Sequence, residues 1–383
     1  MSYSICFIIL CITVASILSL VNIINFAAGE PISIVSTRNH FDKSTGNSTS
    51  TEPYNPLDAG LVDSLCLNQE VVIYVHRVWV YAQMPSSPAI ENFNEALERL
   101  KRSLESEGYH HPLVGFSWDS DTEVDPEGKG WNIAKLIAKE NGPKLGQFIV
   151  DLKNRCIELE NPNLKIRLMG HSMGTRVILS ALDSINRDDL WRASNSNFNI
   201  STANLLGGAI DNNEVLKNNL DIEIDDSTGI KNFYGDAIEE RVDRFYNMYN
   251  HNDDTLESKT YPELNEITLY PAYEGAFALG QYPLSETDPH MPSNYANINV
   301  KDDIITKADA NNDGHCDLSH PYVFTILNEF NRDYLLLPSI YNPYCIIKFD
   351  GDNHFGYIGF RNFDDSLRDE CAIDRVVDTW NLP

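Results

Sequence analysis

The sequence predicts an α/β protein with a mostly parallel central sheet and helices on both faces. Two observations lead to this prediction. Short continuous apolar runs, such as residues 71–75, are typical of strands that are covered on both faces. Between these runs lie segments with an apolar stripe at helical spacing, such as residues 87–109. The alternation of the two indicates a parallel sheet, whose functional groups lie at the carboxyl ends of the strands.

The same alternation continues along the chain. We expect the first helix to start near Ser87 and Pro88, and Gly142 with Pro143 to kink the second. The expected strands are residues 71–75, 112–118, 164–170, 201–210 and 242–250, and the expected helices are residues 87–109, 131–160 and 172–182. The apolar stripe of the first helix consists of Phe93, Ala96, Leu97, Leu100 and Leu104.

The third expected strand ends in the sequence GHSMG, residues 170–174. G-x-S-x-G between a strand and a helix is typical of a nucleophile elbow, in which a serine occupies a tight, strained turn. Gly170 and Gly174 keep side chains away from the neighbouring strand and helix, and we expect the Ser172 hydroxyl to stand exposed above the sheet. The alternative is a chance match in a loop, against which the strand–turn–helix setting argues.

Composition limits the partners of the chain. A hydrophobic fraction of 42% over 383 residues supports a substantial core. The formal net charge of −27 argues against a nucleic-acid partner, because an acidic surface repels phosphate.

The beginning of the chain differs in character from the rest. Residues 1–29 are apolar and almost free of charge, which predicts a signal peptide or a membrane anchor, and both remain open. Residues 30–60 are rich in Ser, Thr, Asn and Pro, which predicts a flexible spacer before a domain at residues 61–383. We therefore expect an exported protein, extracellular or anchored at the cell surface, with glycosylation sequons at Asn47 and Asn199.

Five cysteines lie beyond the leader and allow two disulfides and one free thiol. Their pairing stays open. They are Cys66, Cys156, Cys316, Cys345 and Cys371.

With these motifs in place, the chain resembles the α/β-hydrolase superfamily, in an uncharacterised lipase/esterase-like prokaryotic branch. GHSMG resembles the nucleophile elbow, YVHRVWV at residues 74–80 the oxyanion-loop strand, and GFSWDSD at residues 115–121 the next strand end. The similarity covers residues 71–254. It departs from the family at Arg77, where a glycine usually follows the histidine.

The resemblance implies a catalytic triad in the chain order serine, acid, histidine. Asp253 follows the expected strand at residues 242–250 and is the preferred acid. Asp254 and Asp211 are the alternatives.

The preferred base is His354, which precedes a terminal segment with a helical pattern. His320 and His315 are the alternatives. The oxyanion donors implied by the resemblance are the backbone N–H groups of Met173 and Val78.

Two segments between acid and base carry further expectations. Residues 261–346 are rich in Tyr, Phe, Leu and Pro, which suits a cap-like insertion over the site. Residues 309–320 partly fit a calcium loop, with His320 where a glutamate should stand, and a plain Asx-rich turn is the alternative. If calcium binds there, His315 and His320 are less available as a base.

The sequence thus predicts a serine hydrolase of the carboxylesterase/lipase type, which acts on a small-molecule or lipid ester through an acyl-enzyme and needs no cofactor or catalytic metal. An acyltransferase or amidase would use the same triad. A catalytically silent, calcium-stabilised surface binding module is the alternative from another class. The membrane is a partner only if the leader is not cleaved.

Overall fold

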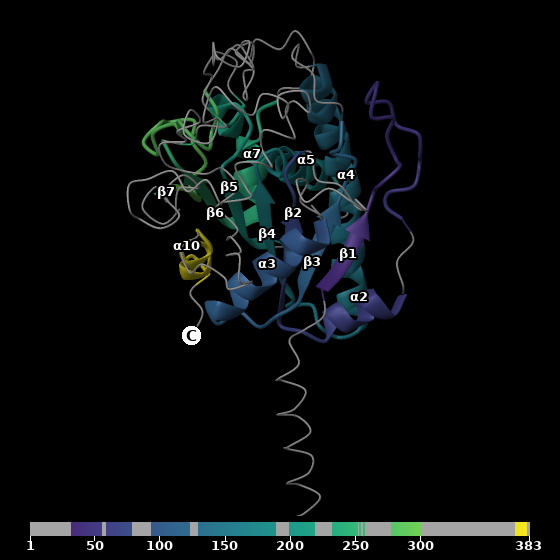
Figure 1. Ribbon diagram of the computed structural model, residues 1–383. Helices are drawn as coiled ribbons and strands as arrows, with labels where there is room; N and C mark the ends of the chain where they lie inside the picture. The colour runs from purple at the N-terminus through teal and green to yellow at the C-terminus, as the bar shows by residue number, and fades with distance from the viewer. Residues whose placement is uncertain are drawn as a thin grey trace, which may run out of the picture. The chain divides into compact units, whose positions relative to one another are not determined.

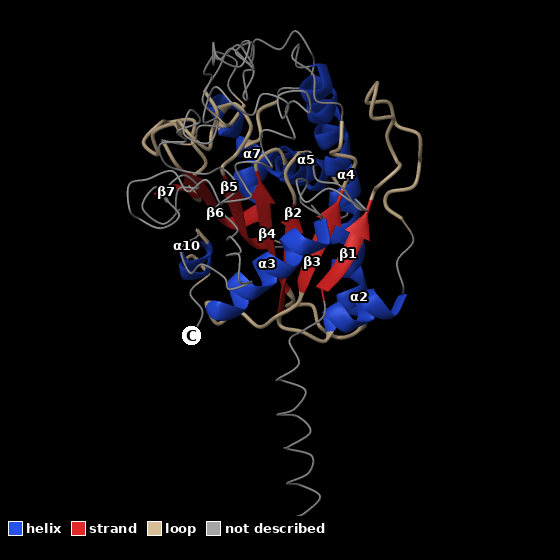
Figure 2. Cartoon of the chain, in the orientation of Figure 1, coloured by secondary structure: helices blue, strands red, loops and turns tan. Residues whose placement is uncertain are grey.

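The computed structural model describes residues 32–55, 59–78, 93–122, 129–188, 199–218, 232–251, 253, 256, 277–300 and 372–380. Figure 1 shows these residues in colour along the chain, and Figure 2 shows their helices and strands.

Seven parallel strands of the described residues form one sheet, in the order β1-β3-β2-β4-β5-β6-β7. The strands are β1 Ile32–Ser36, β2 Glu70–Val75, β3 Leu113–Ser117, β4 Lys165–His171, β5 Ile200–Leu206, β6 Val242–Tyr249 and β7 Tyr295–Asn299. The five strands expected from apolar runs are all present, and the predicted α/β class with a parallel sheet is confirmed.

Helices cover both faces of this sheet (Figure 2). They are α2 Ala59–Cys66, α3 Phe93–Ser106, α4 Lys129–Glu158, α5 Gly174–Arg187, the short 3₁₀ helix η2 Asn212–Val215, α7 Gly235–Arg241 and α10 Ile373–Asp378. The five apolar residues of the predicted α3 stripe are all buried. α4 runs without a break through Gly142 and Pro143.

Alternate residues of β2 show how the two faces are filled. Val71, Ile73 and Val75 pack in the core that contains α2, α4, α5 and α7. Val72 and Tyr74 pack in the opposite core, with α3 and α10. Every residue of β2 is buried, which explains why it reads as a continuous apolar run.

The strand order reverses at β2, which lies between β3 and β4. The chain leaves β2 through α3 toward β3 and returns through α4 to β4 on the other side of β2. Parallel α/β sheets bind ligands at such a switch point, outside the carboxyl ends of the strands. The segments that follow β2 and β4 therefore meet where a site is expected.

The predicted flexible spacer at residues 30–60 is wrong for residues 32–55. β1 pairs in register with β3, from Ile32 with Leu113 to Ser36 with Ser117. Beyond the strand, Tyr54 donates a hydrogen bond of 2.6 Å to Asp151 of α4. β1 is an edge strand in which only alternate residues are buried, so it lacks the continuous apolar run of an interior strand and the segment resembled a polar spacer.

The predicted cap-like insertion at residues 261–346 needs a correction at Tyr295–Asn299. These residues form β7, which extends the sheet beside β6. The ring of Tyr295 stacks on that of Phe245 in β6, with centroids 5.5 Å apart. The leader at residues 1–29, the loop at residues 309–320 and the rest of the insertion lie outside the described residues. Within the described part of the chain, none of the helices has the length and apolar character needed to cross a bilayer.

A disulfide joins Cys66, the last residue of α2, to Cys156 near the end of α4. The two Cα atoms are 4.9 Å apart, and the residues are 90 positions apart in the chain. The sequence left this pairing open. The other three cysteines beyond the leader lie outside the described residues.

Replacing Cys66 and Cys156 together with alanine should lower the free energy of unfolding by about 2–4 kcal/mol, because the open chain gains entropy when unfolded. Urea denaturation of the double variant and the parent measures the difference. Peptide mapping of the non-reduced parent is the control. Recovery of both cysteines as free thiols would contradict the pairing.

Candidate active site

Ser172 occupies the turn between β4 and α5. Its φ angle is 53°, in the left-handed region that residues other than glycine rarely adopt. Such a conformation costs on the order of 1–3 kcal/mol and persists only when the surroundings enforce it. A strained serine at a strand-to-helix turn is the defining geometry of a nucleophile elbow, so the predicted turn is present.

As expected, Gly170 and Gly174 lie where a side chain would collide with neighbouring segments. A Cβ on Gly174 would lie 2.3 Å from the carbonyl oxygen of Val75 and 2.7 Å from that of His76. A Cβ on Gly170 would lie 2.8 Å from Cδ1 of Ile178. The first residue of α5 therefore touches the backbone at the end of β2, and only a hydrogen atom fits between them.

The expectation of an exposed hydroxyl is wrong, because Ser172 is only 3% exposed. Neighbouring segments close around its backbone. The N–H of Ala209, in the loop after β5, and the hydroxyl of Thr175 both donate to the Ser172 carbonyl, at 3.2 and 2.6 Å. The Ser172 N–H donates to the carbonyl of Leu206 at 2.9 Å.

Backbone hydrogen bonds connect this turn to the predicted acid. The N–H of Gly280 donates to Gly208 at 3.0 Å, and the N–H of Asn250 donates to Gly280 at 2.9 Å. The Asp253 N–H then donates to Asn250 at 3.1 Å. Asp253 thus follows the end of β6, two strands from the end of β4 that carries Ser172, at the same edge of the sheet.

The carboxylate of Asp253 lies in a protected position. The residue is fully buried, and its Oδ1 accepts the N–H of Leu256 at 3.2 Å. Asp253 is therefore a buried carboxylate at the carboxyl ends of the strands, the edge that also carries Ser172. The alternative acid Asp254 lies outside the described residues.

Asp211, the other alternative acid, follows β5 and is also fully buried. Its N–H donates to Glu214 Oε1 at 3.4 Å. Glu214 in turn pairs with Arg176 of α5, with Nη2 to Oε1 at 3.1 Å and Nη1 to Oε2 at 3.2 Å. Burial raises the pKa of the Glu214 carboxyl, and the Arg176 guanidinium opposes this rise. This ion pair was not predicted from the sequence, although Arg176 next to the apolar run of residues 177–179 could have indicated it.

The proposed oxyanion donors lie on the two segments that meet at Gly174. Met173 is the residue before α5 and is fully buried, and Val78 follows β2 and is 4% exposed. His76, between β2 and Val78, is fully buried and was not predicted as a site residue.

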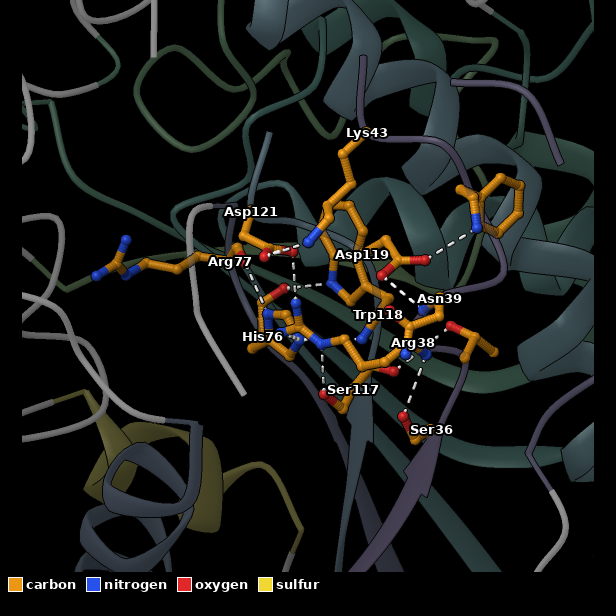
Figure 3. Close-up of polar contacts among 12 residues, drawn as sticks. Ser36, Arg38, Asn39, Lys43, His76, Arg77, Ser117, Trp118, Asp119 and Asp121 are labelled. Atoms are coloured by element: carbon orange, nitrogen blue, oxygen red, sulfur yellow. Dashed lines mark hydrogen bonds and ion pairs between the residues drawn. The ribbon is translucent and has the colours of Figure 1, made fainter. Parts of the chain in front are cut away.

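A second group missed by sequence analysis surrounds His76 (Figure 3). Arg38, two residues after β1, donates from Nε to Ser117 Oγ at 2.9 Å and from Nη1 to Asp121 at 2.8 Å. Lys43 also pairs with Asp121, at 2.6 Å. These contacts tie the segments that follow β1 and β3 together beside the end of β2.

The remaining predicted residues cannot be placed in this geometry. His354, His320 and His315 lie outside the described residues, as does the calcium-like loop at residues 309–320. Among the described residues, no group of three or more His, Cys, Asp or Glu side chains is arranged to hold a metal ion.

Part of the chain matches the model of a known family. Residues 90–254 match the model of a family described as an alpha/beta hydrolase of unknown function, DUF900. Together with the seven-stranded parallel sheet, this match shows that the chain has the α/β-hydrolase fold. No curated protein matches the chain.

Three solved structures are among those to which the chain is similar. A Trichoderma reesei cutinase in complex with a C11Y4 phosphonate inhibitor has 16% identity and a TM-score of 0.22, over 39% of this chain and 65% of the cutinase. A cutinase-like protein from Cryptococcus sp. has 13% identity and a TM-score of 0.23, over 74% and 93% of the two chains. An acetylxylan esterase has 10% identity and a TM-score of 0.27, over 68% and 93%.

Gly174→Ala should lower the free energy of unfolding by about 3 kcal/mol, at the upper end for overpacking, because the new Cβ would press on the backbone carbonyls of Val75, the last residue of β2, and His76. Gly208→Ala is the matched control near the same turn, because its Cβ would meet nothing closer than 3.6 Å and should change stability by less than about 0.5 kcal/mol. Urea denaturation compares the two. Equal effects would show that the contact of α5 with β2 is not tight.

Proposed function

We propose that the chain is a serine hydrolase that cleaves carboxylic esters through an acyl-enzyme. Ser172 is the nucleophile, His354 the general base and Asp253 the residue that orients the histidine. The observation that carries the proposal is the strained backbone of Ser172 in a glycine-flanked turn at the switch point of the sheet. Backbone strain of this kind clusters at active sites, which supports a catalytic role for Ser172.

The proposed reaction has two halves. The Oγ of Ser172 attacks the ester carbonyl carbon while His354 accepts the hydroxyl proton. The tetrahedral intermediate then collapses, and His354 gives the proton to the departing alcohol. Water then attacks the acyl carbonyl while His354 accepts its proton. The second tetrahedral intermediate collapses as His354 returns the proton to Oγ of Ser172, which releases the acid.

The negative charge that develops on the carbonyl oxygen needs preorganised donors. We assign this role to the backbone N–H groups of Met173 and Val78. The close contact between Gly174 and the end of β2 supports the assignment, because it brings the segments that carry the two donors together.

Two features bear on the substrate and the compartment. The formal charge of −27 favours a neutral small-molecule or lipid ester over an anionic one, since like charges repel. The Cys66–Cys156 disulfide supports export, because disulfides persist in oxidising compartments.

Ser172→Ala should abolish hydrolysis of short p-nitrophenyl esters and labelling by a fluorophosphonate probe, because both reactions need the serine hydroxyl. Ser184→Ala, the same change further along α5, should keep both. Gel fluorescence and initial rates measure the outcomes. Labelling of Ser172→Ala at the level of the parent would rule out Ser172 as the nucleophile.

The partners of Ser172 can be tested in pairs. Asp253→Asn and His354→Ala should each lower kcat/KM by about 10³-fold or more, as loss of a triad member does. Asp211→Asn and His320→Ala are the controls and should stay within about tenfold of the parent. If a control loses more activity than its partner, the roles of the two residues are exchanged.

A further inference from the structure

We propose that His76 is a positioning residue that fixes the Arg77–Val78 peptide, so that the Val78 N–H is held ready for the ester oxyanion. This inference rests on the proposed function, and it adds a residue that acts through the backbone rather than on the substrate. It starts from the contacts of the buried imidazole ring.

The two ring nitrogens of His76 face different groups. Nδ1 lies 2.7 Å from the carbonyl oxygen of Arg77. Nε2 accepts the backbone N–H of Trp118 at 3.1 Å and lies 3.5 Å from Nη2 of Arg38. A carbonyl can only accept and these N–H groups can only donate. The contacts therefore assign the proton to Nδ1, which donates to Arg77, and leave Nε2 as an acceptor.

The surroundings keep the ring neutral in this tautomer. Burial lowers the pKa of His76 well below its usual range, and the Arg38 guanidinium lowers it further. Arg38 is itself held by Ser117 and Asp121 (Figure 3). The segment after β1, which looked like a spacer in the sequence, thus helps to define the state of the ring.

Aromatic packing fixes the plane of the ring. His76 stacks on Trp118 with centroids 5.5 Å apart and lies 4.7 Å from the ring of Phe93. The indole Nε1 of Trp118 also donates to the His76 carbonyl at 3.0 Å. These contacts fix the imidazole in the orientation in which Nδ1 reaches the carbonyl of Arg77.

The held carbonyl determines where the next N–H points. In a trans peptide the C=O and N–H groups point in opposite directions, so a fixed Arg77 carbonyl also fixes the Val78 N–H. The Arg77 side chain adds a second constraint, since its Nη1 donates to the Val78 carbonyl at 3.0 Å. The carbonyls of Arg77 and Val78 therefore both accept hydrogen bonds from side chains of this segment. They lie next to the backbone that touches Gly174.

Two substitutions separate the two halves of this contact. His76→Asn places an amide nitrogen close to the position of Nδ1 and keeps a donor for the Arg77 carbonyl. His76→Gln places its terminal group close to the position of Nε2 and keeps an acceptor for the Trp118 N–H, but loses that donor. Both variants lose the ring and its stacking, so each controls for the packing defect of the other.

We expect His76→Gln to lower kcat by about 10²- to 10³-fold with KM within about threefold, as loss of one oxyanion donor does. His76→Asn should stay within about tenfold of the parent. The affinity of a boronic acid, which mimics the tetrahedral intermediate, should fall in parallel with kcat/KM. Equal losses in the two variants at equal thermal stability would overturn the inference.

A measurement on the parent protein needs no substitution. Nitrogen NMR of the ¹⁵N-histidine-labelled protein, with His76 assigned through residues 75–77, should show a neutral ring with its proton on Nδ1. A ring protonated on Nε2, or charged at neutral pH, would refute the proposal. A parent that fluorophosphonate does not label would instead refute the serine hydrolase function itself.

Discussion

The site depends on one contact between backbones, the approach of Gly174 at the start of α5 to the carbonyls of Val75 and His76. No side chain can stand between them. The contact brings the turn that carries Ser172 against the end of β2, and it does so with backbone atoms that cannot change rotamer. A second glycine, Gly142 in α4, has the same function on the far side of α5, where a Cβ would lie 2.3 Å from atoms of Ser180. Helix α5 is therefore held closely on two sides.

One buried and one partly buried ion pair hold the segments around this contact. Arg176 and Glu214 connect α5 to the segment after β5, and Arg38 and Asp121 connect the segments after β1 and β3. Removing charges from water costs free energy that the pair recovers only in part, so such pairs contribute little net stability. Their value here is positional, since each links two segments of the chain near the carboxyl ends of the strands.

The sequence pattern predicted the elements whose own residues show how they are buried or how they turn. The interior strands are buried on both faces and read as apolar runs, and the turn at Ser172 is marked by glycines two residues away on either side. β1 and β7 lie at the edges of the sheet, carry few buried residues, and were missed for that reason. His76 could not be identified from the sequence, because its partners Arg38 and Trp118 are 38 and 42 residues away. The choice of base depends on histidines beyond the described residues.

The strand order also has a consequence for how the chain is made. β1, β2, β3 and the disulfide between α2 and α4 all precede the elbow in sequence. From β4 to β7, each new strand pairs with the one before it, after β4 has joined the free edge of β2. During synthesis from the amino terminus, each strand from β4 onward can therefore pair with a strand that has already been made. The strained serine is synthesised after β2, whose end meets Gly174, and before Thr175, Leu206 and Ala209, whose hydrogen bonds close around its backbone.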